Sequence, residues 1–94
     1  MRVRWLRRAL ANLEAEAEYI AVDDPAAAGR VVLRIFRAVD LLKKNPALGR
    51  AGRVAGTREL VVAGTPYIVP YRVRGEAVEV LRVFHPARKW PVKL

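Results

Sequence analysis

The stretch RELVVAGTPYIVPYRVRGEAVEVLRVF, residues 58–84, decides the fold. It contains three segments, residues 58–63, 67–73 and 77–84, that are rich in the Val, Ile, Leu and Tyr typical of β-strands. The gaps between them are short and hold turn-forming residues, Gly64 to Pro66 in one and Arg74 to Glu76 in the other. Consecutive segments are therefore predicted to pair as antiparallel hairpins.

The middle segment carries two further signals. Pro70 lies inside it and has no amide hydrogen for a ladder bond, so this strand is predicted to lie at an edge of the sheet or to be bulged there. Alternation places Tyr67 and Tyr71 on one face and Arg72 and Arg74 on the other. Aromatic residues so placed can stack on bases, but we expect the two tyrosines to belong to the core.

Two amphipathic helices precede this stretch. Helical spacing of apolar residues begins at Leu6, breaks at Asp23–Asp24–Pro25, and resumes until Asn45–Pro46. Asp24 is suited to cap free amides and Pro25 to open a helix. The predicted buried stripes are Leu6, Ala9, Leu10, Leu13, Ala17, Ile20 and Ala21 in the first helix, and Ala28, Val31, Val32, Ile35, Val39 and Leu42 in the second.

A short strand is expected at the start of the chain, because Val3 alternates with Arg2 and Arg4. The predicted fold is α+β, with a two-helix hairpin packed on a small, mainly antiparallel sheet of three to four strands. The expected order is strand, helix, helix, strand, strand, strand. With 53% hydrophobic residues, we expect residues 1–94 to form one domain with a single modest core.

Composition narrows the class of protein. The chain has no cysteine, so it can form no disulfide framework, and its apolar runs are far shorter than a membrane span. We therefore expect it in the cytoplasm. Its net charge is +9, and residues 46–94 hold nine Lys/Arg against three Asp/Glu. This excess favours a polyanionic partner, although a basic surface that serves solubility alone is the alternative.

At this point the sequence resembles the RelE/ParE toxin superfamily over almost its whole length. The residues that carry the resemblance are Asn45, Pro46, Gly49, Arg50, Gly56–Thr57–Arg58–Glu59–Leu60, Gly64–Thr65–Pro66–Tyr67, Tyr71–Arg72–Val73, Leu81–Arg82–Val83–Phe84–His85, Ala87–Arg88 and Trp90–Pro91. The resemblance implies a cognate antitoxin as partner. It implies one of two targets: messenger RNA on the ribosome, which some relatives cleave, or DNA gyrase, which the ParE branch poisons.

For RNA cleavage the resemblance implies His85 as the acid–base group, with Arg72 and Arg88 at the phosphate. The alternative for His85 is an ordinary hydrogen-bonded histidine at a strand end. Nucleic-acid-binding candidates are Arg50, Arg53, Arg58, Arg74, Arg82 and Lys89, any of which can instead be a solvated strand position. No metal or cofactor is expected.

The sequence also departs from the RNA-cleaving branch. Leu60 and Ile68 stand where that branch has basic residues, and Val92 lies near the place of its terminal tyrosine. The leading hypothesis is nevertheless a metal-independent, ribosome-dependent mRNA endonuclease, with a non-enzymatic gyrase inhibitor as the alternative. A third possibility is a module that binds only an antitoxin. Trp90 can anchor the tail or meet a partner.

Overall fold

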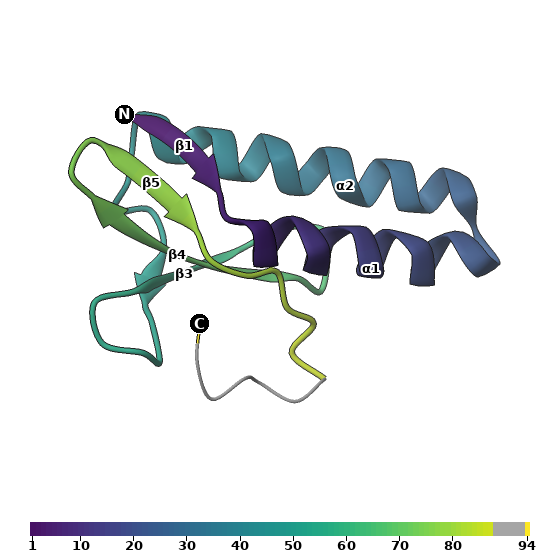
Figure 1. Ribbon diagram of the computed structural model, residues 1–94. Helices are drawn as coiled ribbons and strands as arrows, with labels where there is room; N and C mark the ends of the chain where they lie inside the picture. Colours follow the sequence, from purple (N-terminus) through teal and green to yellow (C-terminus); the bar gives the residue numbers. More distant parts are fainter. Residues whose placement is uncertain (88–93) are drawn as a thin grey trace.

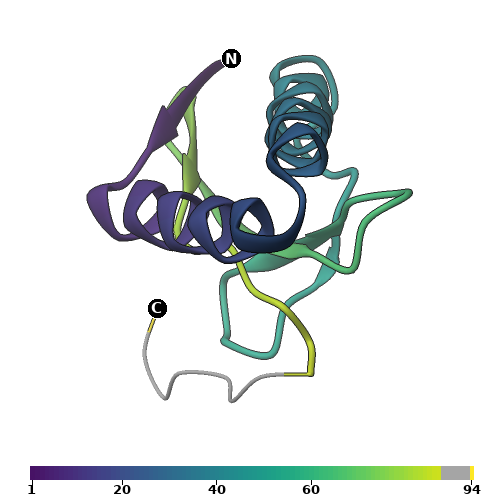
Figure 2. The ribbon, with the colours of Figure 1, turned by 90° about the vertical axis from the view of Figure 1, so that its right-hand side faces the viewer.

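The computed structural model describes residues 1–87 and Leu94 (Figure 1). In chain order its elements are β1 (Arg2–Trp5), α1 (Arg7–Asp23), α2 (Pro25–Asp40), the 3-10 helix η1 (Leu41–Lys43), β2 (Arg50–Ala51), β3 (Arg58–Val61), β4 (Ile68–Arg74) and β5 (Ala77–Val80). Figures 1 and 2 show both helices on one side of the sheet, with the loop between β2 and β3 projecting from the other side. The predicted α+β fold, a helical hairpin on a small sheet, is confirmed. Within the described residues, no helix combines the length and apolarity needed to cross a membrane.

The sheet has five strands, in the order β1-β5-β4-β3-β2, which is one more than the predicted maximum. The additional strand is β2, which pairs antiparallel with β3. It contains only Arg50 and Ala51, so it leaves no alternating pattern in the sequence. The predicted strand at the start of the chain is present as β1, and it pairs in parallel with β5, while the other pairs are antiparallel.

The prediction that the Pro70 strand lies at an edge of the sheet is wrong, because β4 lies in the middle, between β3 and β5. The predicted bulge lies in the segment opposite it. Tyr71 pairs with Val80 and Ile68 pairs with Phe84, so two residues of β4 face three residues of the returning chain. The Leu81 amide donates to the Pro70 carbonyl at 2.9 Å, but Pro70 has no amide hydrogen to return that bond. The regular ladder of β5 therefore stops at Val80 instead of continuing to Phe84 as predicted.

The helices bury one face each against the sheet. The Asp24 side chain accepts a hydrogen bond from the Ala27 amide at 3.0 Å, with Pro25 in the first turn of α2, which confirms the predicted helix start. Leu10, which was predicted in the buried stripe of α1, is 45% exposed instead. The largest side chains in the core include Ile35 and Leu42, each worth roughly 1.5–3 kcal/mol on burial. The remaining members of the core cluster are Ala9, Leu13, Val39, Leu60, Val62, Tyr67, Val69, Tyr71, Val78, Val80 and Val83.

Tyr67 and Tyr71 belong to this core, as predicted, and Tyr71 also fixes the loop that precedes β2. The Tyr71 hydroxyl donates to the Pro46 carbonyl at 2.7 Å and accepts from the Gly49 amide at 2.8 Å. A Cβ atom on Gly49 would lie 2.7 Å from Cε1 of Tyr71, so only glycine fits there without movement. One fully buried phenol therefore holds this loop at two points.

We predict that Tyr71→Phe lowers the free energy of unfolding by about 1–3 kcal/mol, because it leaves the buried Gly49 amide without its acceptor. Urea denaturation followed by circular dichroism measures the change. Tyr19→Phe is the matched control, since Tyr19 is 67% exposed and its loss should cost no more than about 0.5 kcal/mol. Equal costs for the two variants would contradict this role of Tyr71.

Candidate functional site

The face of the sheet opposite the helices contains two buried carboxylates. Core residues such as Leu60 and Val80 point toward the helices, so strand alternation turns their neighbours Glu59 and Glu79 to the other face. Glu59 is only 3% exposed and Glu79 only 4% exposed. A buried carboxylate is costly unless cations or hydrogen-bond donors surround it, so the partners of these two groups define the chemistry of this face.

Three arginines surround Glu79. The register places Arg4 of β1 and Arg72 of β4 on either side of it. Arg72 Nε donates to Glu79 Oε1 at 2.8 Å, Arg4 Nη1 lies 3.5 Å from Oε2, and Arg74 Nε lies 3.9 Å from Oε1. The hydrogen bond from Arg72 lowers the pKa of Glu79, against burial, and the charges of the three arginines lower it further.

Glu59 lies on the same face of the sheet, on β3 at the far side of β4, and has a similar arrangement of partners. Arg50 Nη2 donates to Glu59 Oε1 at 3.3 Å across the β2–β3 pair. The backbone amide of Arg53 donates to Oε2 at 2.9 Å, and Arg53 Nε lies 3.9 Å from the same oxygen. Glu59 therefore holds both β2 and the start of the loop that follows it.

These two groups give the helix-free face a positive excess. Five arginines surround two carboxylates, which leaves three positive charges among the residues that form these ion pairs. The Arg4 and Arg74 side chains are 57% and 68% exposed, so more than half of each lies open to solvent. Guanidinium groups presented in this way can bind the oxygens of phosphate or carboxylate groups. Of the candidates that the sequence suggested, Arg50 and Arg53 belong to the Glu59 group, and Arg72 and Arg74 to the Glu79 group.

His85 lies elsewhere. Its ring makes an edge contact with Tyr67, with ring centroids 5.7 Å apart, and its Nδ1 accepts from the Ala87 amide at 3.1 Å. The Tyr67 hydroxyl in turn donates to the buried Glu16 of α1, so this contact belongs to the helix-covered side. Arg72 is on the opposite face and four residues further along β4 than Ile68, about 13 Å away along the strand. The structure does not bring His85 and Arg72 into one site.

The other suggested arginines also lie apart from the five. Arg58 Nη1 donates to the Gly49 carbonyl at 2.9 Å and the Ala47 carbonyl at 3.4 Å, so it helps to hold the loop before β2. Arg82 lies in the bulge, and its buried Nε has no hydrogen-bond partner among the residues that the structure describes. Burial lowers the pKa of Arg82, and the nearby charge of Arg8 lowers it further. The suggested residues Arg88, Lys89 and Trp90 lie outside the described residues.

Sequence reasoning did not single out Arg4, Glu59 or Glu79 for this site. The signal for Glu79 is a lone acid inside the apolar segment Ala77–Val80, which predicts a charged partner. No sequence signal identified Arg4, because it reaches Glu79 only through the parallel pairing of β1 with β5.

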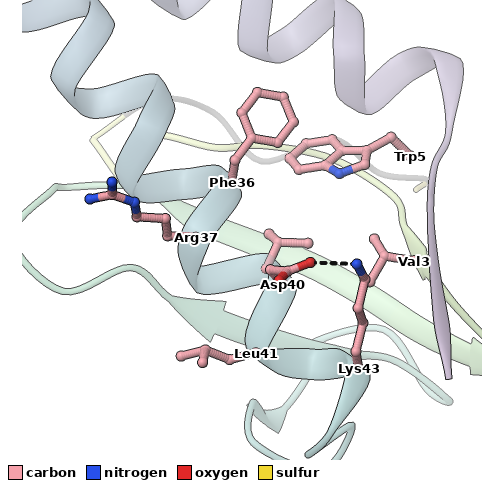
Figure 3. A pocket seen from close by; sticks show the side chains of 8 residues that line it. Val3, Trp5, Phe36, Arg37, Asp40, Leu41 and Lys43 are labelled. Carbon is pink, nitrogen blue, oxygen red and sulfur yellow. Dashed lines mark ion pairs between the residues drawn. The ribbon is translucent and has the colours of Figure 1, made fainter.

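The structure also has hollows with a smaller charge excess, of which one has Arg37 and Lys43 against a single acid. One, of about 610 Å³, lies between β1 and the end of α2, where the Trp5 and Phe36 rings meet with centroids 4.9 Å apart (Figure 3). Its acidic residue, Asp40, is paired with Lys43 at 2.7 Å. A second, lined mainly by small and apolar side chains, lies between α1 and α2 and includes Ala21, Val32 and Leu33. These hollows suit apolar contacts more than catalysis.

Comparison with known proteins identifies the relatives of this chain. Residues 3–90 match the family model described as the ParE toxin of the type II toxin–antitoxin system parDE. The putative toxin Y4kP of Sinorhizobium fredii is 53% identical over 90 residues, which cover 96% of this chain and 93% of that protein. Toxin RelE2 of Caulobacter vibrioides is 43% identical over 86 residues, which cover 92% and 96% of the two chains.

Solved structures agree with this grouping. A chain of the chromosomal ParDE toxin–antitoxin system from P. aeruginosa superimposes with a TM-score of 0.82 at 32% identity, over 90% of this chain and 95% of that chain. The toxin–antitoxin complex RelBE2 from Mycobacterium tuberculosis shares the fold, with a TM-score of 0.65 at 23% identity over 89% and 95% of the two chains. The chain therefore belongs to the ParE toxin family of type II toxin–antitoxin systems, within the RelE/ParE superfamily.

Proposed function

We propose that this toxin arrests growth by binding DNA gyrase and inhibiting it, as the ParE branch does, without catalysis of its own. The observation that carries the proposal is the separation of His85 from Arg72, which lie on opposite faces of the sheet. General acid–base cleavage of RNA needs the proton carrier and the phosphate-binding cations around one phosphodiester. The described residues offer no such convergence.

Two substitutions relative to the RNA-cleaving branch support the same proposal. Leu60 and Ile68 stand where that branch has basic residues, and each is only 6% exposed. A buried aliphatic side chain neither contacts a phosphate nor neutralises its charge. The match to the ParE family model also favours this mechanism.

Ribosome-dependent cleavage of messenger RNA is the second candidate. Two observations favour it: the 43% identity to a toxin named RelE2, and the partial exposure of the His85 ring. In this mechanism His85 would transfer the proton, and Arg72 and Arg88 would bind the phosphate. It would require His85 and Arg72 to approach each other on the ribosome.

We also propose a cognate antitoxin as the partner of this chain, because both structural relatives come from toxin–antitoxin systems. Two features provide surfaces for a segment of such a protein. The groove between α1 and α2 is largely apolar, and the arginines around Glu79 and Glu59 suit acidic side chains.

The purified full-length toxin should inhibit supercoiling of relaxed plasmid by gyrase and leave ribosome-bound messenger RNA intact. The His85→Ala variant should inhibit gyrase with a potency within about twofold of that of the wild type, because the proposed action needs no proton transfer at this position. Were the toxin a nuclease, loss of a general acid–base group would lower cleavage by about 10²–10⁴-fold.

Gel electrophoresis of plasmid topoisomers and primer extension on messenger RNA measure the two activities side by side. Tyr19→Ala, on the exposed face of α1, controls for handling of the variants. Messenger cleavage that disappears in His85→Ala, with unimpaired supercoiling, would establish the second candidate and exclude the first.

A further inference from the structure

Glu79 is surrounded by more positive charge than it can neutralise. One carboxylate lies within 4 Å of three guanidinium groups, those of Arg4, Arg72 and Arg74. Arg72 makes the shortest of these contacts, a hydrogen bond of 2.8 Å to Oε1, and its charge alone equals that of the carboxylate. The two further arginines leave a local charge of +2 beside a buried acid, where they repel one another.

The geometry of this cluster separates an inner from an outer part. The Glu79 side chain is 5% exposed and lies beneath the arginines, with Arg72 the most covered of the three at 35%. The Arg4 and Arg74 side chains come from β1 and β4, on either side of β5, and more than half of each is open to solvent. Glu79 therefore contacts all three guanidinium groups, and the side chains of Arg4 and Arg74 stay largely open to an incoming anion.

We infer that Glu79 is a positioning residue, and that Arg4, Arg72 and Arg74 form a binding site for the backbone phosphates of DNA. The inference deepens the proposed action on gyrase and rests on it for the choice of DNA, because gyrase acts on DNA. Phosphate contacts need fixed cations and little apolar surface. The apolar residues flanking Arg72 and Glu79 on this face, Pro70 and Leu81, are both buried.

The second group continues the same surface. Arg50 and Arg53 lie around Glu59, on the far side of β4 from Glu79. The spacing between neighbouring strands, about 4.8 Å, sets the positive charges out across the sheet. Such an array suits a polyanion with repeated charges better than a single small anion.

Glu79 could either stabilise the fold alone or position the arginines for DNA. The two roles lead to opposite effects of one substitution on DNA affinity. Glu79→Gln removes a negative charge and raises the net charge of the protein by one. If bulk charge governs DNA binding, this variant binds DNA more tightly. If Glu79 positions the arginines, the variant binds more weakly in spite of its higher charge.

The test measures the affinity of the full-length toxin for a fluorescein-labelled DNA duplex by anisotropy over a series of NaCl concentrations. We expect Glu79→Gln to weaken binding by about fivefold. The matched control is Glu76→Gln, which makes the same charge change at an exposed residue of the preceding turn and should bind equally well or more tightly.

A plot of log affinity against log salt concentration has a negative slope. Arg4→Gln and Arg72→Gln should each make this slope shallower by about 0.9, whereas Arg30→Gln on α2 should leave it unchanged. A thermal unfolding curve shows whether Glu79→Gln folds. If it does not, the salt slopes of Arg4→Gln and Arg72→Gln test the inference instead.

Tighter DNA binding by Glu79→Gln, or unchanged salt slopes in both arginine variants, would overturn the inference. So would a wild-type toxin that binds a polyglutamate peptide but not DNA, because the site would then serve an acidic protein segment. If the wild type inhibits supercoiling yet has no affinity for DNA, the inference fails while the proposed function stands. If it binds DNA through these arginines and gyrase remains active, the proposed function fails instead.

Discussion

The central strand β4 is hydrogen-bonded to β3 on one side and to β5 on the other, and this placement governs both faces of the protein. Successive side chains of a strand point to opposite faces, so β4 sends Tyr71 into the core and Arg72 to the helix-free side. Tyr71 then fixes the loop before β2 through Pro46 and Gly49. Because the same backbone positions both residues, a shift of one residue in register would exchange the core for the charged face.

The bulge opposite Pro70 determines the path of the chain after β5. A proline in a central strand removes one ladder bond, and the extra residue after β5 accommodates that loss. Phe84 then pairs with Ile68, and His85 comes to lie beside Tyr67, on the side of α1. The only histidine is thus separated from the arginines of the other face by the sheet itself. This separation is the basis of the proposal that the protein inhibits its target by binding and not by nuclease activity.

Much of the fold could be predicted from local patterns. The two helices, the start of α2 at Asp24 and the three principal strands follow from spacing and capping. The sequence could not reveal β2, which is too short for a pattern, or the parallel pairing of β1, which joins residues far apart in the chain. The charged site was harder to predict than the fold, because it depends on the order of the strands. Alternation identifies Arg72, but Glu79 of β5 and Arg4 of β1 become its neighbours only through the order of the strands.

The energetics of its ion pairs determine which ligands the helix-free face favours. Burial of Glu79 carries a desolvation cost, but the hydrogen bond from Arg72 outweighs it, because the pKa of Glu79 is lowered. Arg4 and Arg74 add further attraction to Glu79, but together with Arg72 they carry two more positive charges than one carboxylate neutralises. The three guanidinium groups repel one another, and an anion that binds between them would lower this repulsion. The same logic holds at Glu59, where Arg50 and Arg53 share one carboxylate. The positive excess on this face suits a negatively charged ligand, and the two buried acids hold the guanidinium groups that such a ligand would contact.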